Sequence, residues 1–161
     1  MLKIVSPTGQ GIRSDSWGSG KFRALRTKLG ADGKLVKYEH QGVDFIAHPG
    51  QEAFPPIAGK VMREARPHVG ELYSGILITN GYLSIKMFYF EPFPEFLREI
   101  KWADLDTPIG HVQDISARKP EWKGKMIPHV HVEIRLNPRY SSTKVEEAFR
   151  DGILIDPEIL L

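Results

Sequence analysis

The sequence predicts a mostly β fold of antiparallel strands, and three observations support this prediction. The 161 residues include fifteen glycines and twelve prolines, a share that favours many short strands and turns over a helical bundle. Asn80-Gly81 separates two apolar runs at residues 75–79 and 82–90, which is the strongest short-range signal of a β-hairpin. Residues 129–135 alternate strictly between polar and apolar side chains, as a half-buried strand does.

The composition narrows the class of protein. Hydrophobic residues make up 41% and charged residues 26% of the chain, the usual mix for a soluble globular protein. The formal net charge of +2 gives no electrostatic footprint for nucleic acid. The chain has no cysteine, so a bound metal would need nitrogen and oxygen ligands. The apolar start ends at Ser6-Pro7, too soon for a signal peptide, and no apolar run has membrane-spanning length.

Further strands and loops are predicted from alternation and from turn residues. Residues 43–47 and 58–65 are expected to be strands, because their apolar side chains cluster between proline- and glycine-containing breaks. The segment 6–34 is rich in Gly, Ser and basic residues and is expected to be a loop with at most one short ordered turn. Residues 117–125, which include Trp122, are expected to form an exposed loop.

Two short helices are predicted in the second half of the chain. The first covers residues 94–102, where several apolar residues can share one side. The second covers residues 143–150, because Thr143 and Glu146 have the spacing of a capping box and a glycine follows the helix. Between them, residues 107–110 are expected to turn into another short strand.

The alternating strand carries the residues with the most informative chemistry. His129 and His131 are two positions apart, so they share the polar face while the valines and isoleucine between them face a core. A second pair, His40 and Asp44, flanks Gly42, which allows a bend that can bring the two side chains together. Two histidines and one carboxylate, with a fourth position for water, are typical of catalytic zinc rather than structural zinc.

From spacing alone, a simpler interpretation stays open. His-x-His on an exposed strand face is a common pattern, and Asp44 would then only cap a turn. The other histidines, His48, His68 and His111, are expected to be surface or turn residues rather than metal ligands.

Three segments resemble the lysostaphin/LytM-type zinc metallopeptidase family, which has the duplicated hybrid motif fold. They are His40-Gln41-Gly42-Val43-Asp44 followed by Pro49-Gly50, then residues 56–61, and finally residues 128–135. The resemblance implies that residues 1–161 are a single zinc-binding domain with its core at about 20–157. It also implies an antiparallel β-sheet groove or sandwich of the LytM type, with short helices in insertions and at the C-terminus.

The resemblance also implies roles for individual residues. His40, Asp44 and His131 would be the zinc ligands, and His129 would be one of two catalytic histidines. Arg26 would line the substrate groove. Members of this family cleave the peptide cross-bridges of peptidoglycan, so the expected site of action is extracytoplasmic, in a cell wall or on a phage particle.

One departure from the family pattern concerns the second catalytic histidine. The family has it in a Tyr-x-His-Leu segment after the hairpin, where this chain has Met87-Phe88-Tyr89-Phe90. This stretch is most similar to the leukocyte-derived chemotaxin branch of the family, which is regarded as keeping zinc without peptidase activity. Tyr89 would therefore either replace the histidine as a hydrogen-bond donor or be an ordinary packed tyrosine on the face of Leu83 and Ile85.

Two functions follow from these observations. The first is a zinc metalloendopeptidase that acts on peptidoglycan cross-bridges, with His129 and Tyr89 assisting. The second is a zinc-containing binding module without turnover that recognises a cell-wall glycopeptide or a protein partner, with Trp17, Trp122 and Tyr73 as candidate contacts. His129 favours the enzyme, because a purely structural zinc site does not need it, whereas Tyr89 favours the module.

Overall fold

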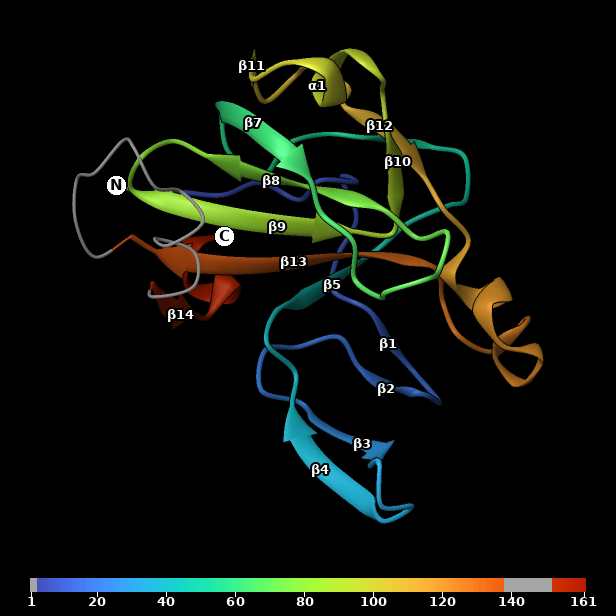
Figure 1. Ribbon diagram of the computed structural model, residues 1–161. Helices are drawn as coiled ribbons and strands as arrows, with labels where there is room; N and C mark the ends of the chain where they lie inside the picture. Colours follow the sequence, from blue (N-terminus) through green and yellow to red (C-terminus); the bar gives the residue numbers. More distant parts are fainter. Residues whose placement is uncertain (1–2, 138–151) are drawn as a thin grey trace.

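The computed structural model describes residues 3–137 and 152–161. Its main sheet is antiparallel throughout, with the strand order β11-β7-β8-β9-β13-β14 and with β5 also paired to β13 (Figure 1). The strands are β5 (Val43–Ile46), β7 (Gly59–Glu64), β8 (Gly75–Thr79), β9 (Leu83–Phe88), β11 (Lys101–Ala103), β13 (His129–Leu136) and β14 (Ile153–Ile155). The predicted mostly β, antiparallel fold is confirmed.

The strand β13 organises the sheet. One of its edges pairs with β9 over its central and C-terminal part, from His131 to Leu136. Its other edge pairs first with β5 and then, further along, with β14. The predicted alternation is confirmed, since Val130, Val132 and Ile134 have no exposed surface. These side chains join the main hydrophobic core between the sheet and the segments that cover it.

The β8–β9 hairpin matches its sequence signal. Thr79 pairs with Ser84 at the end of the ladder, and Gly81 in the connecting turn has a positive φ of 91° that glycine adopts at no steric cost. The Asn80 side chain accepts hydrogen bonds from the backbone N–H groups of Tyr82 and Leu83. The turn is therefore held by its own side chain as well as by the strands.

Three smaller antiparallel units complete the described residues. They are a sheet of β10 (Phe90–Pro92), β12 (Gly110–Val112) and β6 (Glu52–Ala53), a hairpin of β1 (Ser14–Asp15) and β2 (Gly18–Ser19), and a ribbon of β3 (Leu25–Leu29) and β4 (Leu35–Glu39). The β3–β4 ribbon projects from the body of the protein (Figure 1). The predicted turn at 107–110 does lead into β12.

Two sequence predictions need correction here. The segment 6–34 is not all loop, because it contains β1, β2 and β3. Strand β3 is almost wholly exposed, so it has no buried face and leaves no alternating pattern for sequence analysis to detect. The helix predicted over 94–102 is only α1 (Glu95–Arg98), because residues 101–103 instead pair with β7 as β11.

The remaining helical segments are short 3₁₀ turns. They are η1 (Ile115–Arg118), η2 (Pro120–Trp122) and η3 (Pro157–Leu160). The helix predicted over 143–150 lies outside the described residues, and η3 was not predicted from the sequence. No helix in the described part of the chain combines the length and the apolar character needed to cross a membrane.

Candidate metal centre and groove

Strand pairing places two of the three predicted ligands opposite each other. Asp44 on β5 is the register partner of His131 on β13, and the His131 Nδ1 atom lies 2.9 Å from Asp44 Oδ1. Asp44 is 3% exposed. The ladder thus fixes a buried carboxylate against an imidazole that is 87 residues away in the sequence.

His40 reaches the same point from the end of the β3–β4 ribbon. Its Nε2 atom lies 3.1 Å from Asp44 Oδ1 and 3.0 Å from His131 Nδ1. Gly42 permits this approach mainly through its small size, because a Cβ atom there would collide with the Val132 carbonyl and lie 2.8 Å from the His131 ring. The sequence predicted that Gly42 allows a bend. The structure gives a further reason for glycine at this position, namely the close approach of the Val132 carbonyl and the His131 ring.

The three atoms suit a single cation of the size of zinc. Zinc holds nitrogen and oxygen ligands at about 2.0–2.2 Å, so neighbouring ligand atoms in a tetrahedral site are roughly 3.3 Å apart, close to the separations observed. The other nitrogen of His40, Nδ1, lies 2.9 Å from the Lys21 carbonyl. When Nδ1 donates to that carbonyl, Nε2 of a neutral His40 presents a lone pair toward the Asp44 oxygen, and a cation between the two acceptors removes their repulsion. Within the described residues, this is the group of ligand atoms close enough to hold a metal ion.

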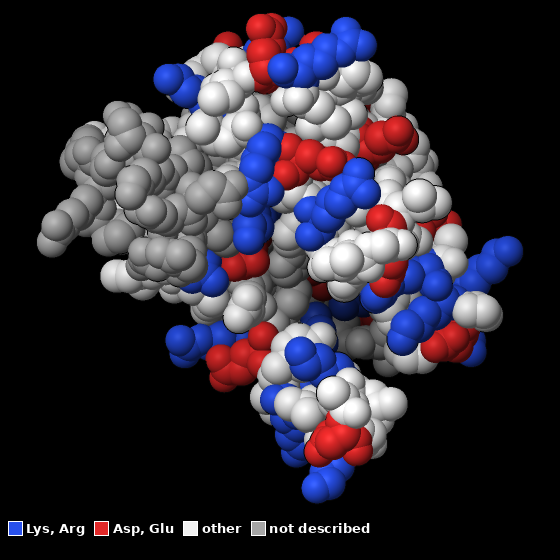
Figure 2. Space-filling view, in the orientation of Figure 1, with Lys and Arg blue, Asp and Glu red and all other residues white. Residues whose placement is uncertain are grey.

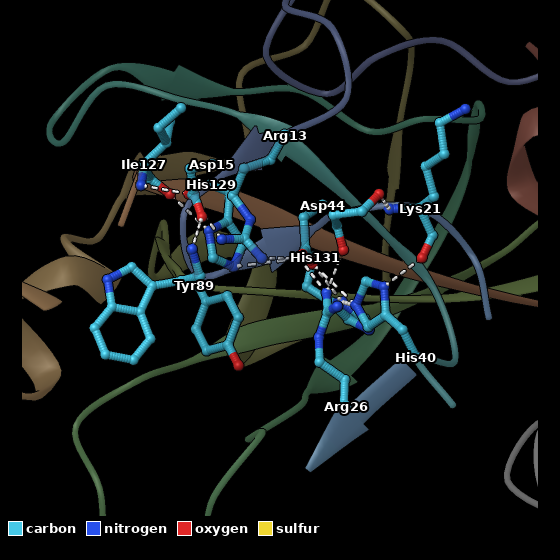
Figure 3. A network of polar contacts seen from close by, with 12 residues as sticks. Arg13, Asp15, Lys21, Arg26, His40, Asp44, Tyr89, Ile127, His129 and His131 are labelled. Atoms are coloured by element: carbon cyan, nitrogen blue, oxygen red, sulfur yellow. Dashed lines mark hydrogen bonds and ion pairs between the residues drawn. The ribbon is translucent and has the colours of Figure 1, made fainter. Parts of the chain in front are cut away.

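Two arginines surround the other oxygen of the carboxylate. Arg13, which is 3% exposed, places a guanidinium nitrogen 3.3 Å from Asp44 Oδ2, and Arg26 places one 3.6 Å away (Figure 3). Burial by itself raises the pKa of the Asp44 carboxyl, but the nearby His129, His131 and His40 rings outweigh it and hold that pKa well below its usual value. Asp44 is therefore a carboxylate, as a metal ligand must be.

His129 lies beside the cluster without joining it. Its Nδ1 atom is 2.9 Å from the Ile127 carbonyl, and its Nε2 atom is 3.8 Å from Asp44 Oδ2. Burial lowers the pKa of His129, and Arg13 and His131 lower it further while Asp44 opposes them. With Nδ1–H donated to Ile127, the neutral ring keeps a lone pair on Nε2, which is the requirement for a proton acceptor.

Tyr89 lies between β9 and β10 in an unusual backbone conformation. Its φ is 73°, a left-handed value that is uncommon for a residue other than glycine. The ring meets the His129 ring edge-on at a centroid distance of 5.5 Å (Figure 3) and lines the groove. Leu83 and Ile85 have no exposed surface, whereas Tyr89 is only half-buried and lies outside the core cluster.

The candidate ligands open into a groove of about 1080 Å³. The hollow is visible in Figure 2 between the β3–β4 ribbon and the body of the protein. Trp17 and Trp122 line it as a pair with ring centroids 6.3 Å apart. Trp122 was predicted to lie in an exposed loop, but it is half-buried at the end of η2. Tyr73 donates its hydroxyl to the Asp114 carbonyl over 3.1 Å. Arg26 lines the groove, where it also donates to the Ser19 carbonyl over 2.6 Å.

Two residues at the groove were not predicted from the sequence. Arg13 lies in a segment expected to be loop, and nothing in its neighbours indicates that it becomes buried. His68 was expected at the surface, yet it lines the groove and its Nε2 atom is 3.5 Å from the Tyr89 hydroxyl. The sequence signal for both was weak, since each depends on a contact across the fold rather than on spacing.

Comparison with known proteins finds a related sequence and several similar solved structures. No family model matches the chain. Leukocyte cell-derived chemotaxin-2 of Bos taurus is 34% identical over 80 residues, which are 48% of this chain and 47% of the bovine protein. Helicobacter pylori Csd3 has a TM-score of 0.53 and 20% identity, over 88% of this chain and 34% of Csd3. The resemblance to the lysostaphin/LytM-type family is confirmed.

The lysostaphin solution structure gives a TM-score of 0.48 and 16% identity, over 83% of this chain and 49% of lysostaphin. The chain therefore matches less than half of the bovine protein, about half of lysostaphin and about a third of Csd3. The likeness to Csd3 supports the LytM-type fold. The evidence for a metal site is the geometry of His40, Asp44 and His131.

Proposed function

We propose that this protein is a zinc metalloendopeptidase that acts on the peptide cross-bridges of peptidoglycan. The observation that carries the proposal is the convergence of His40, Asp44 and His131 at a groove, with the buried His129 beside them. A ligand set of two imidazoles and one carboxylate leaves a coordination position for water or substrate.

The residues of this chain would divide the chemistry between them. Zinc held by His40, Asp44 and His131 would supply Lewis-acid polarisation and a water of lowered pKa. His129 Nε2 would accept the proton of the attacking water and return it to the leaving amine. Arg13 holds the second oxygen of Asp44, which keeps the first oxygen directed at the two imidazoles.

Tyr89 would act as a hydrogen-bond donor and not as a base. Burial raises the pKa of its hydroxyl above the usual value, and the Asp44 carboxylate raises it further, so the phenol stays protonated at neutral pH. A donor of this kind can stabilise the oxyanion that forms on the peptide carbonyl, and such donors are worth roughly 10²- to 10³-fold in rate.

The substrate class and the place of action rest on the resemblance to the family. Cross-bridge cleavage implies an extracytoplasmic site of action, in a cell wall or on a phage particle. The groove is large enough for several residues of a peptide, since ligand pockets commonly measure about 300–1000 Å³. Arg26 would contact the bound peptide, and residues 1–161 would act as one domain.

A second candidate function is a zinc-containing binding module without turnover. The similarity to Leukocyte cell-derived chemotaxin-2 and the presence of Tyr89 in place of a second histidine favour it. In that case the groove would hold a cell-wall glycopeptide or a protein segment, with Trp17 and Trp122 as contacts.

Zinc content and hydrolysis, measured together, separate the two functions. We expect the purified protein to contain one zinc per chain and to hydrolyse pentaglycine or a peptidoglycan digest. His129→Ala should keep the zinc and lose about 10²- to 10⁴-fold in rate, the range for a lost acid–base group. A zinc-containing protein that binds these peptides but cleaves none of several cross-bridge types would overturn the peptidase and support the module.

A further inference from the structure

His68 and Tyr89 meet at the groove from two different parts of the chain. His68 lies on the connection between β7 and β8, and its Nε2 atom is 3.5 Å from the Tyr89 hydroxyl, with the ring centroids 6.4 Å apart. The Tyr89 ring also contacts the His129 ring edge-on. Tyr89 therefore contacts two imidazoles, and His68 is the one near its hydroxyl.

A shared set of contacts holds this connection and Tyr89 in place. The Gln113 side chain accepts from the Ser74 N–H over 2.9 Å and donates to the Leu72 carbonyl over 3.0 Å. The Tyr89 N–H donates to the Ser74 carbonyl, and the Gln113 N–H donates to the Tyr89 carbonyl, both over 2.9 Å. Because Ser74 and Gln113 bind both segments, the position of His68 is tied to that of Tyr89.

A salt bridge anchors the connection nearer to His68. Arg118 on η1 forms two 2.6 Å hydrogen bonds to the Glu71 carboxylate, the bidentate geometry that fixes orientation best. The neighbouring Val69 is fully exposed. The connection is thus exposed at Val69 and anchored on its C-terminal side through Glu71, Leu72 and Ser74.

The surroundings of His68 favour the neutral imidazole, which can donate one hydrogen bond. Burial lowers the pKa of His68, and the nearby Arg118 lowers it further while Glu71 opposes it. A neutral imidazole carries one N–H, and its place on Nδ1 or Nε2 depends on the hydrogen bonds available. The Tyr89 oxygen can accept one bond while its hydrogen donates another.

We propose that His68 is a positioning residue for Tyr89. Its Nε2–H donates to the Tyr89 hydroxyl oxygen, so that the hydroxyl hydrogen is left to donate to the carbonyl oxygen of a peptide in the groove. The separation of 3.5 Å between Nε2 and the hydroxyl oxygen is at the long end of the hydrogen-bond range. This role rests on the proposed function in one respect, namely that the groove binds a peptide.

Nitrogen NMR of the histidine rings tests the pair without any activity. In the zinc-loaded protein we expect the His68 Nε2 to have the ¹⁵N shift of a protonated nitrogen, and Tyr89→Phe to move His68 toward a mixture of tautomers. His111 packs against Phe93 at 5.0 Å and provides an internal control that should not change. The same His68 tautomer population in both proteins would overturn the proposal.

Binding and kinetics test the consequence of the pair. We expect His68→Ala to lower kcat by about 10-fold with KM and zinc content unchanged, a smaller loss than that of the donor itself. His68→Gln should restore part of the rate, because its amide N–H can replace the imidazole donor. In a Tyr89→Phe background, His68→Ala should have no further effect.

If no peptide is cleaved, the affinity for a phosphinic analogue of pentaglycine can be measured instead. Its values for the wild type, the two single variants and the double variant give a double-mutant cycle. A smaller loss for His68→Ala than for Tyr89→Phe, together with a loss for the double variant equal to that of Tyr89→Phe alone, supports the pair even when the peptidase fails. Additive losses, or a loss in His68→Ala that is as large in the Tyr89→Phe background, overturn the pair even when the peptidase is active. The failures of the two proposals are therefore distinguishable.

Discussion

Asp44 and His131 face each other across a β ladder, with 2.9 Å between the carboxylate Oδ1 and the imidazole Nδ1. Both residues therefore lie on strands that are paired and largely buried, rather than on loops. A site built on such elements holds its geometry with little dependence on a bound ligand. His40 is the third member and comes from the end of the exposed ribbon, so it is the ligand with the least support from the sheet.

Removal of a ligand should remove the metal. We expect His131→Ala to lose zinc, with an affinity loss larger than the 10- to 100-fold typical of residues that only support ligands. Metal analysis after dialysis against a weak chelator measures this, and His111→Ala is the matched histidine control because it lies outside the groove. Full zinc occupancy in folded His131→Ala would contradict the assignment of the centre.

The close approach at Gly42 should make this position intolerant of any side chain. Gly42→Ala would press a methyl group against the Val132 carbonyl and the His131 ring, at a cost of about 1–3 kcal/mol, and should also weaken zinc binding. Urea denaturation measures the free energy of unfolding. Gly11→Ala is the control, because a Cβ atom there meets nothing within 4 Å. Equal stability of the two variants would show that the approach is not tight.

A histidine at position 89 should improve hydrolysis. Burial holds the pKa of the Tyr89 phenol above its usual value, whereas an imidazole titrates near neutral pH and can exchange protons there. Histidine also tolerates the left-handed backbone at this position better than most residues do. We expect Tyr89→His to raise kcat by on the order of 10²-fold, with zinc content unchanged, in a peptide hydrolysis assay.

An unchanged rate for Tyr89→His would favour the binding module, provided that metal analysis confirms zinc in the variant. Tyr89→Phe is the matched control for this comparison, because it keeps the ring and removes the hydroxyl. It should lower the rate of a peptidase.

The half-buried Asp15 should make stability depend on pH in the acidic range. Burial alone raises the pKa of Asp15, but the N–H groups of Ile127 and Trp17 and the Arg13 guanidinium outweigh it and lower the pKa below its usual value. A carboxyl whose pKa is lower in the folded state stabilises the protein above the unfolded pKa, near 4, and that stability is lost as the pH falls through the folded pKa.

Urea unfolding of the metal-free protein at pH 6 and at pH 2.5 measures this effect. We expect the wild type to exceed Asp15→Asn by about 1.5–3 kcal/mol at pH 6, the range for hydrogen bonds to a charged group, and by much less at pH 2.5. A difference that stays constant with pH would show that the Asp15 charge has no part in stability.

Segments with a strong local pattern were predicted correctly from the sequence, whereas a strand without such a pattern was not. The strand at 129–135 and the hairpin around Asn80-Gly81 were predicted correctly, because one has a strict polar alternation and the other has a specific turn residue pair. Strand β3 was missed because both of its faces are exposed. The helix over 94–102 was predicted too long because pairing with β7 overrides local preference in its second half.

The sequence by itself determined the nitrogen- and oxygen-donating side chains and the faces on which they lie. The absence of cysteine, the His-x-His alternation and the His-x-x-x-Asp spacing are local properties, and local geometry fixes the direction of side chains along a strand. Only the tertiary structure decided that Arg13 holds the Asp44 carboxylate and that His68 meets Tyr89. Those contacts join loop residues to distant parts of the chain, and no periodic pattern records the path of a loop.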